Sequence, residues 1–536
     1  MDKRRRKFWG WGVEEADLTP EEQKRWVKRM ESQFDLSGLE LTPPPKLEEI
    51  ELPQPRITPP DTLSDLCSSA PYDRAGHTYG KGFPDVVRAY ERDFSVAPDL
   101  VAFPGTEQDI VNLLDWCSSA GVAAIPYGGG SSVVKGTEPD VGEGFKGTLS
   151  IDMKNIDKVL EIDETSRAAN IQAGIYGPAL EGALKPHGLT LRHFPQSFEF
   201  STLGGWIATR SGGHYATLYT HIDEFVESLR VITPSGTVGT LRLPGSGAGP
   251  SPDRFFIGSE GAMGIITSAW MRVQDRPTFR ANAALTFPDF LVASEAVRAV
   301  SQAGLYPANI RILDAGEAYF NGVAEGDEAV MVLGFESADH PLDAWMSRAL
   351  ECCRDHGGTL EGEGGDSKTE SRHRQGMAGA WRDSFIRMPY VWEALVAMGM
   401  ITETFETAIT WERFPEFHET VIGEMTEVME EVCGGGFISC RFTYAYPDGP
   451  VPYYSITAPG KKGSQLEMGG EIKKAISELF LRLGGTITHH HGVGRYHHEW
   501  YKKQRPDGFG KVLEEAKRVL DPAGIMNPGV LIDPQR

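Results

Sequence analysis

The chain lacks the features that mark secreted, membrane-spanning and nucleic-acid-binding proteins. Its six cysteines (Cys67, Cys117, Cys352, Cys353, Cys433 and Cys440) include no Cys-x-x-Cys pair, so they favour a reducing, cytoplasmic location over a disulfide scaffold. No apolar run approaches the roughly 20 residues that cross a bilayer. A net charge of −22 provides no basic field for nucleic acid, although a buried site can still attract an anion.

Two further signals are missing. The basic residues 3–7 are followed by no apolar segment, so they are not a secretory signal, and we interpret them as a solvated terminus rather than a membrane contact. No Gly-x-Gly-x-x-Gly links a strand to a helix, which excludes a Rossmann domain.

The 536 residues are too many for one ordinary core, and short strands alternating with helices predict an α+β fold. We expect an N-terminal extension and linker at 1–92, with a proline-rich connector at 43–60 and a helix capped by Thr19. A first domain should span 93–277 and a second α+β block 278–480. Residues 481–536 form a C-terminal segment.

Glycine is abundant where its lack of a side chain matters most. Three stretches stand out: PYGGGSSV at 126–133, FEFSTLGGWIATRSGG at 198–213 and GSEGAMGIIT at 258–267. Successive backbone N–H groups in such turns form concave sites for a pyrophosphate. Each stretch alone could be an ordinary turn. Together they favour a dinucleotide or flavin site.

A histidine motif, GGTITHHHGVGR, occupies residues 484–495. Thr486–His491 is β-prone, which predicts His489 and His491 on one side and His490 on the other. That geometry suits a single metal poorly, so we expect no metal. The histidines could simply end a strand, but imidazole titrates nearest neutrality and proton handling is favoured.

The three glycine-rich stretches resemble the FAD domain of the vanillyl-alcohol-oxidase type flavoproteins, and most closely the alkyldihydroxyacetonephosphate synthase family. The runs Trp9–Gly12 and Pro307–Asp314 and the histidine motif are similar to that family too. The resemblance implies a two-part FAD-binding domain, an α+β cap or substrate domain, and a C-terminal helical segment returning to the flavin. With no histidine inside 126–132, we expect non-covalent FAD there, although a covalent link elsewhere stays open. The FAD contacts implied are Pro126, Tyr127, Gly128, Gly129, Gly130, Ser131, Ser132, Gln196, Ser197, Phe198, Ser201, Thr202, Gly205, Thr209, Arg210, Ser211, Gly212, Glu260, Gly261, Gly264, Ile265 and Ile266.

The resemblance also implies active-site residues. His490 and His491, with His489 beside them, match the family's histidines, and Arg311 and Tyr453 match its arginine and tyrosine. From the residues alone, Arg311 could instead form a surface ion pair with Asp314. Tyr454 could be the tyrosine that points inward.

One position departs from the family. Trp392 stands where the family has its phosphate-binding arginine, and indole offers one N–H instead of a bidentate guanidinium. Arg387, five residues earlier, is a second candidate for substrate binding. The departure predicts a changed substrate, unless another cation such as Arg441 or Arg495 fills the role.

The family reaction exchanges the acyl group of an acyl-dihydroxyacetone phosphate for a fatty alcohol through a flavin N5 adduct, in ether lipid synthesis. The rival hypothesis is an FAD-dependent oxidase or dehydrogenase of an alcohol or 2-hydroxy acid, which Trp392 favours; a non-enzymatic FAD protein is a third. We expect a small-molecule or lipid substrate, no nucleic acid, peripheral membrane contact and a homodimer. No sequence feature defines the assembly.

Overall fold

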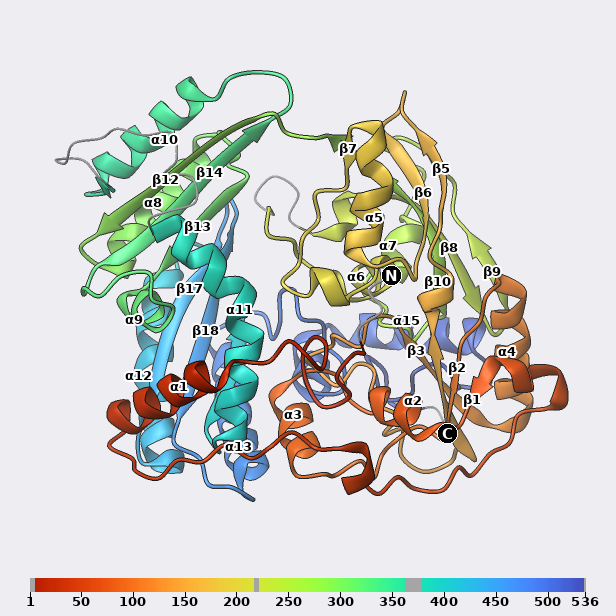
Figure 1. Cartoon of the computed structure of the whole chain (residues 1–536). Helices are drawn as coiled ribbons and strands as arrows, with labels where there is room; N and C mark the ends of the chain where they lie inside the picture. Colours follow the sequence, from red (N-terminus) through yellow and green to blue (C-terminus); the bar gives the residue numbers. More distant parts are fainter. Residues whose placement is uncertain (1–4, 216–220, 362–376, 535–536) are drawn as a thin grey trace.

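A computed structural model describes residues 5–215, 221–361 and 377–534. Figure 1 shows two lobes, each built on β-sheets, with the C-terminal segment lying between them. One lobe contains a seven-stranded sheet, and the other contains a four-stranded and a five-stranded sheet. The mixture of helices and sheets confirms the α+β class predicted from the sequence.

The α-helices are α1 (Pro20–Gln33), α2 (Pro71–Gly76), α3 (Phe83–Tyr90), α4 (Glu107–Ala120), α5 (Gly177–Leu184), α6 (Leu203–Thr209), α7 (Pro252–Phe256), α8 (Phe290–Gln302), α9 (Ala315–Phe320), α10 (Asp343–Asp355), α11 (Met377–Ala397), α12 (Phe414–Cys433), α13 (Gln465–Arg482), α14 (His498–Gln504) and α15 (Asp507–Leu520). The strands are β1 (Cys67–Ser68), β2 (Leu100–Ala102), β3 (Val122–Tyr127), β4 (Gly147–Asp152), β5 (Val159–Asp163), β6 (Ala168–Gln172), β7 (Leu189–Thr190), β8 (Val226–Thr233), β9 (Gly236–Gly239), β10 (Ile265–Arg272), β11 (Gln274–Asp275), β12 (Phe279–Phe287), β13 (Asn309–Leu313), β14 (Ala329–Ser337), β15 (Thr359–Leu360), β16 (Ile401–Glu406), β17 (Phe437–Ala445) and β18 (Pro450–Ala458).

The first lobe presents the glycine-rich stretches at strand ends. Its four-stranded sheet has the order β1-β2-β4-β3, with β2 and β3 both parallel to β4. β3 is buried along most of its length and runs directly into Gly128–Gly130. The five-stranded antiparallel sheet has the order β5-β6-β10-β8-β9, and β10 begins directly after Gly264. Two of the three glycine-rich stretches therefore join buried strands.

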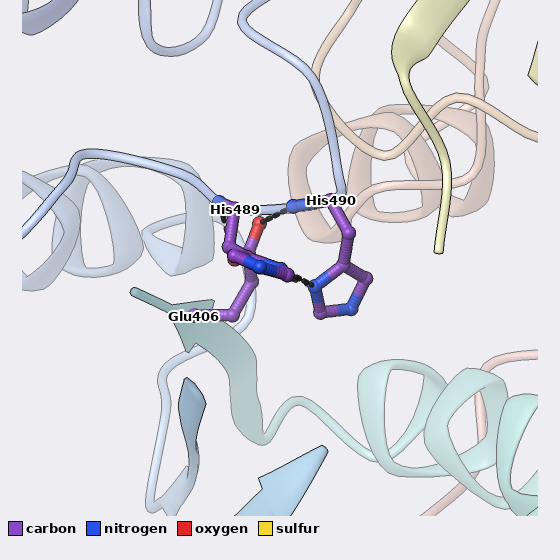
Figure 2. A group of neighbouring side chains, drawn as sticks. All are labelled: Glu406, His489 and His490. Atoms are coloured by element: carbon purple, nitrogen blue, oxygen red, sulfur yellow. Dashed lines mark hydrogen bonds and ion pairs between the residues drawn. The ribbon is translucent and has the colours of Figure 1, made fainter. Parts of the chain in front are cut away.

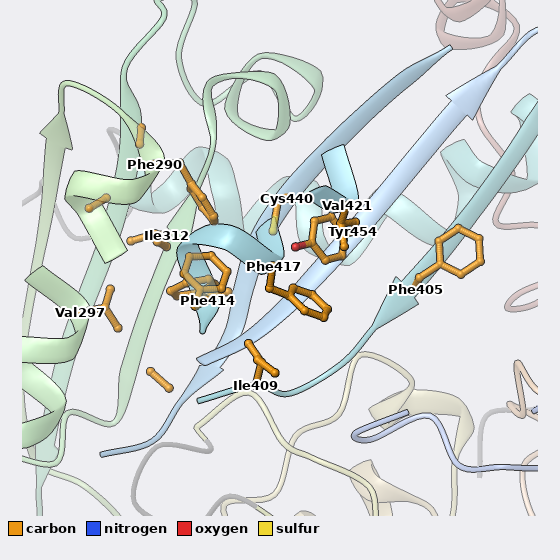
Figure 3. Packing of buried hydrophobic residues seen from close by; sticks show 14 of the residues in the cluster. Phe290, Val297, Ile312, Phe405, Ile409, Phe414, Phe417, Val421, Cys440 and Tyr454 are labelled. Carbon is orange, nitrogen blue, oxygen red and sulfur yellow. The ribbon is translucent and has the colours of Figure 1, made fainter. Parts of the chain in front are cut away.

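The seven-stranded sheet of the second lobe has one apolar and one polar face. Its order is β15-β12-β14-β13-β17-β18-β16. Side chains alternate across a strand, so Phe405 and Tyr454 point to one face, where they join a core with Phe414 and Phe417 from α12 (Figure 3). The neighbouring residues Glu406 and Tyr453 point to the other face, toward the first lobe.

The N-terminal extension packs on both lobes. Thr19 caps α1 as predicted, and Glu22 completes a capping box with it. Phe8 and Trp9 are buried as expected, whereas Trp11 is only half-buried. A Cβ on Gly10 would lie 2.3 Å from the carboxylate of Glu393 on α11, so only glycine lets the chain pass this close.

The histidine motif is not a strand. Residues 483–492 are irregular, so the predicted alternation of His489 and His491 against His490 is wrong. Tertiary contacts override the strand propensity here, because the buried carboxylate of Glu406 binds backbone N–H groups that a neighbouring strand would otherwise bind. None of the helices in the described ranges has both the length and the apolar character needed to cross a membrane.

Candidate active site

Three cavities meet between the lobes. The first and third together form what we call the glycine-rich trough, because all three glycine-rich stretches line it and residues such as Gly128, Ser132 and Thr202 border both parts. The second cavity, here called the side chamber, lies between α11 and the polar face of the seven-stranded sheet. Thr404, Arg441 and Tyr453 line both the trough and the side chamber, so the two spaces adjoin there.

The trough depends on glycines that no other residue can replace. A Cβ on Gly129 would lie 1.9 Å from the carbonyl oxygen of Phe200, and one on Gly128 would lie 2.4 Å from Oγ1 of Thr202. Gly130 has a φ of +64°, in the left-handed region that favours glycine. The first two stretches therefore press on each other, and their hydroxyls and backbone donors line one channel. Such a donor set fits the diphosphate of a dinucleotide.

Most of the predicted cofactor residues line this trough. They are Pro126, Tyr127, Gly128, Gly129, Gly130, Ser131, Ser132, Gln196, Ser197, Ser201, Thr202, Gly205, Thr209, Ser211, Gly212, Glu260, Gly261, Gly264, Ile265 and Ile266.

Two predicted cofactor residues lie outside its walls. Phe198 stacks on Trp206 with ring centroids 6.1 Å apart, and the guanidinium of Arg210 pairs with Asp223 at 2.8 Å. Both residues support the trough from behind.

Glu260 has a structural task within the trough. Its two carboxylate oxygens accept hydrogen bonds from the backbone N–H groups of Val493 and Gly494, each at 2.7 Å. Burial raises the pKa of Glu260 to about 7, against the opposing effect of these two donors. The carboxylate thereby ties the histidine motif of the C-terminal segment to the first lobe.

Glu406, at the end of β16, holds the other side of the same motif (Figure 2). Its carboxylate accepts hydrogen bonds from the backbone N–H of His489, of His490 at 3.1 Å and of His491 at 3.0 Å, and from Oγ1 of Thr488 at 2.6 Å. Burial alone would raise its pKa, but the neighbouring histidines, His490 above all, hold the pKa well below its ordinary value. Glu406 is therefore an ionised anchor.

The three histidines then take different positions. His490 and His491 both line the trough. The Nδ1 atoms of these two rings lie 3.4 and 3.8 Å from Glu406, so Nε2 is the nitrogen left for a reacting group. Burial lowers the pKa of His491 to about 3. His489 instead contacts the hydroxyl of Tyr446 at 2.7 Å and His221 at 3.3 Å, and it lines neither cavity.

The spacing of Glu406, His489 and His490 would admit a metal ion, but their atoms are already engaged. The Glu406 oxygens accept the four hydrogen bonds above, and Nδ1 of His489 lies 3.3 Å from Nδ1 of His490 (Figure 2). A metal would have to displace the bonds that shape the motif. The absence of a metal stays a prediction.

A row of side chains crosses the polar face of the sheet beside the histidines. Arg441 of β17, Tyr453 of β18 and Glu406 of β16 are directly opposite one another in register. The Arg441 guanidinium lies 3.9 Å over the Tyr453 ring and pairs with Glu317. Tyr453 therefore faces the cavities, while Tyr454 is buried in the core, which decides between the two predicted tyrosines.

Arg311 also lines the trough and is only 1% exposed. The alternative of a surface ion pair with Asp314 is therefore wrong. Asp314 caps α9 through Glu317 and accepts from the backbone N–H of Cys440. Burial lowers the pKa of Arg311 to about 10, which still leaves it cationic at neutral pH.

Of the two candidate substrate-binding residues, Trp392 lines a cavity and Arg387 does not. Trp392 lines the side chamber, and its indole Nε1 has no hydrogen-bond partner among the described residues. Arg387 is exposed, pairs with Glu22 at 2.6 Å and lines neither cavity. Arg495 is held by carbonyl oxygens of Lys135 and Pro528, away from both cavities. Of the two alternative cations, only Arg441 borders the chamber.

Comparison with known proteins agrees with this site. Residues 98–242 match the family described as "FAD binding domain", and residues 276–531 match "FAD linked oxidases, C-terminal domain". The fold and the trough thus define a flavoprotein whose cofactor is FAD.

Similar proteins indicate which kind of FAD-dependent flavoprotein this chain resembles. An alkyldihydroxyacetonephosphate synthase of Dictyostelium discoideum is 29% identical over 98% of this chain and 87% of its own. A solved alkyldihydroxyacetonephosphate synthase is 25% identical with a TM-score of 0.79 and covers 98% of both chains. The glycolate oxidase subunit GlcD of Bacillus subtilis is 26% identical over 81% of this chain and 88% of its own. The chain is thus similar over nearly its whole length to alkyldihydroxyacetonephosphate synthases, as its motifs indicated.

Sequence reasoning missed several residues of the site. Glu406 stands in no motif, and nothing in the local sequence marks it as the anchor of a loop 83 residues away. Trp11, which was not among the predicted site residues, borders both cavities. Tyr444 and Lys81 also line the cavities. A polar residue alternating with buried ones in β16 or β17 was the available signal.

We predict that Gly129→Ala abolishes most FAD binding. The added methyl group would overlap the Phe200 carbonyl, and overpacking of this kind costs about 1–3 kcal/mol. Flavin absorbance per mole of purified protein measures the loss. Gly182→Ala, on α5 with no atom within 4 Å of its Cβ, is the matched control and should keep its FAD. Full flavin content in Gly129→Ala would contradict a tight trough.

We predict that Glu406→Gln keeps FAD but lowers turnover by about 100-fold, since small displacements of reacting groups have effects of that size. An amide cannot accept all the hydrogen bonds that the carboxylate accepts, so the histidine motif should shift. Turnover and flavin content are the readouts. Glu412→Gln, at an exposed position, is the control. Equal turnover in both variants would show that Glu406 does not position the motif.

Proposed function

We propose that this chain is an FAD-dependent enzyme that exchanges the acyl group of an acyl-dihydroxyacetone phosphate-type ketone for a fatty alcohol, as in ether lipid synthesis. The observation that carries the proposal is the meeting of His490, His491 and Tyr453 at the junction of trough and side chamber. The similarity to alkyldihydroxyacetonephosphate synthases over nearly the whole chain supports it. We also propose that the boundaries 92/93, 277/278 and 480/481 separate the domains.

The residues of the trough fit FAD. The glycines whose Cβ positions are blocked line the channel with backbone N–H groups and hydroxyls, a donor set for the diphosphate. FAD bound by these residues would supply an electron sink for the reaction. The chain's own groups bind and orient the ketone and move its protons.

His491 is the proposed base. Its depressed pKa leaves the imidazole neutral near pH 7, with Nε2 free of the Glu406 anchor. It can take a proton from the carbon next to the carbonyl when the acyl group leaves, and return it after the alcohol adds. Tyr453, whose pKa is raised by burial, keeps its phenol proton and can donate to an oxygen of the substrate. Arg311 and Arg441 add positive charge at the same face.

The alternative function is an FAD-dependent oxidase or dehydrogenase of an alcohol or 2-hydroxy acid. Trp392 favours it, because the side chamber lacks a guanidinium at that position. The similarity to a glycolate oxidase subunit agrees with it. The same histidines would then remove the hydroxyl proton. As further proposals, the chain acts as a cytoplasmic homodimer that contacts membranes peripherally to reach a lipid substrate.

Labelled fatty alcohol distinguishes the two functions. Incubation with an acyl ketone phosphate should move the label into an ether product with no net bleaching of the flavin. The alternative requires anaerobic bleaching by the alcohol or hydroxy acid alone. Bleaching without any labelled ether would overturn the exchange function.

We predict that His491→Ala keeps FAD and loses about 100- to 10,000-fold in turnover, the usual size of a general base effect. His489→Ala is the matched comparison, because His489 lines neither cavity, and it should lose much less. Steady-state rates with flavin content measured in parallel provide the test. A larger loss in His489→Ala than in His491→Ala would reverse the assignment.

A further inference from the structure

The side chamber contains a buried cation that the active-site description leaves without a role. Lys81, in the loop between α2 and α3, is only 4% exposed and lines the chamber. Its backbone N–H donates to the Ser132 carbonyl at 2.6 Å, next to the trough. Its ammonium forms no hydrogen bond or ion pair with any residue in the described ranges. A buried, unpaired ammonium is costly unless a ligand supplies the anion.

The two buried carboxylates nearest in charge effect to Lys81, Glu393 and Asp85, bind other partners. Glu393 binds Lys7, the backbone N–H of Trp11 and the hydroxyl of Tyr90. Asp85 pairs with Arg88 and with the backbone N–H of Gly82. Neither carboxylate forms a hydrogen bond or ion pair with the Lys81 ammonium, although both favour its charged form at longer range and oppose the effect of burial, which lowers its pKa.

The other charged residues near the chamber are also paired. Arg6 donates to the carbonyl oxygen of Gly129 at 2.9 Å, and Arg441 pairs with Glu317. Among the described residues that line the chamber, Lys81 is therefore the charged side chain with no direct ion-pair partner.

The chamber walls define the rest of the ligand. The Trp392 side chain lines the same chamber, and its buried indole N–H has no hydrogen-bond partner among the described residues. The remaining lining includes an apolar set: Phe320, Met388, Pro389, Leu395, Phe437 and Ile456. One cation, one neutral donor and an apolar wall together suit an amphiphile with a single oxyanion group.

We propose that Lys81 is the specificity-determining residue of the side chamber and binds the phosphate or carboxylate group of the substrate, whose apolar part lies along the α11 wall. The identity of the substrate in this inference rests on the proposed function. The binding experiment that tests the inference does not. Lys81, in the α2–α3 loop, would thus supply the positive charge that the resemblance implies for position 392.

The test measures binding to the FAD-loaded enzyme by calorimetry, so it does not depend on turnover. The probes are decanoate, decanol and inorganic phosphate. Decanoate should bind the parent enzyme, and Lys81→Met should weaken it by about 10- to 100-fold, as expected for loss of a charge-assisted hydrogen bond. Lys81→Arg should stay within about threefold of the parent. Decanol should bind all forms equally.

Controls separate a binding role from a structural one. Lys24→Met, at an exposed position on α1, should bind decanoate like the parent enzyme. Without ligand, Lys81→Met should retain FAD and melt no lower than the parent, because it removes an unpaired buried charge. A lower melting temperature with loss of decanol binding as well would show that Lys81 only supports the fold, and would overturn the proposal.

Inorganic phosphate identifies the kind of oxyanion. Competition with decanoate in the parent but not in Lys81→Met supports a phosphate-bearing substrate. Decanoate binding that depends on Lys81 without phosphate competition supports a carboxylate. Equal decanoate affinity in parent and Lys81→Met, or none in the parent, overturns the proposal. A failed alcohol-exchange assay with intact Lys81-dependent binding would sink only the proposed reaction.

Discussion

The site depends on one buried carboxylate. Glu406 gathers three consecutive backbone N–H groups and a hydroxyl at the end of β16, and this forces the histidine motif out of an extended conformation. In a strand, His490 and His491 would point to opposite faces. Wrapped around Glu406, both line the trough, and His489 turns away. The pair of adjacent histidines is thus a product of a tertiary contact.

The two anchors of the motif come from different lobes. Glu406 belongs to the seven-stranded sheet, and Glu260 belongs to the glycine-rich stretch that lines the trough. Each binds backbone N–H groups of the C-terminal segment, so the segment joins the lobes where their cavities meet. Burial raises the pKa of both carboxyl groups, but the balance differs. Neighbouring histidines outweigh burial at Glu406, whereas burial dominates at Glu260 and raises its pKa to about 7.

Local sequence patterns predicted the features that depend on the conformation of neighbouring residues, namely turns, helix caps and strands. The glycine-rich stretches, the Thr19 helix cap and the alternation of short strands with helices follow from local backbone preferences, and all are present. The resemblance added Tyr453, Arg311 and the histidines, which the fold brings together. Glu406, Lys81 and the burial of Arg311 were beyond reach, because each depends on contacts between segments far apart in the sequence.

The departure that the resemblance implies at position 392 can be compared with the three-dimensional surroundings of Trp392. Trp392 sits on α11 and Lys81 on the α2–α3 loop, yet both border the same chamber. The loop reaches it because Gly80 and Gly82 lie against the backbone carbonyls of Ser132 and Val133, where a Cβ would be 2.2 and 2.6 Å away. Lys81 comes from the N-terminal region, next to the glycine-rich stretch at 126–133. It therefore approaches a ligand from a different wall of the chamber than a cation on α11 would. The chamber therefore retains a positive pole while presenting an aromatic face, and a substrate must match both.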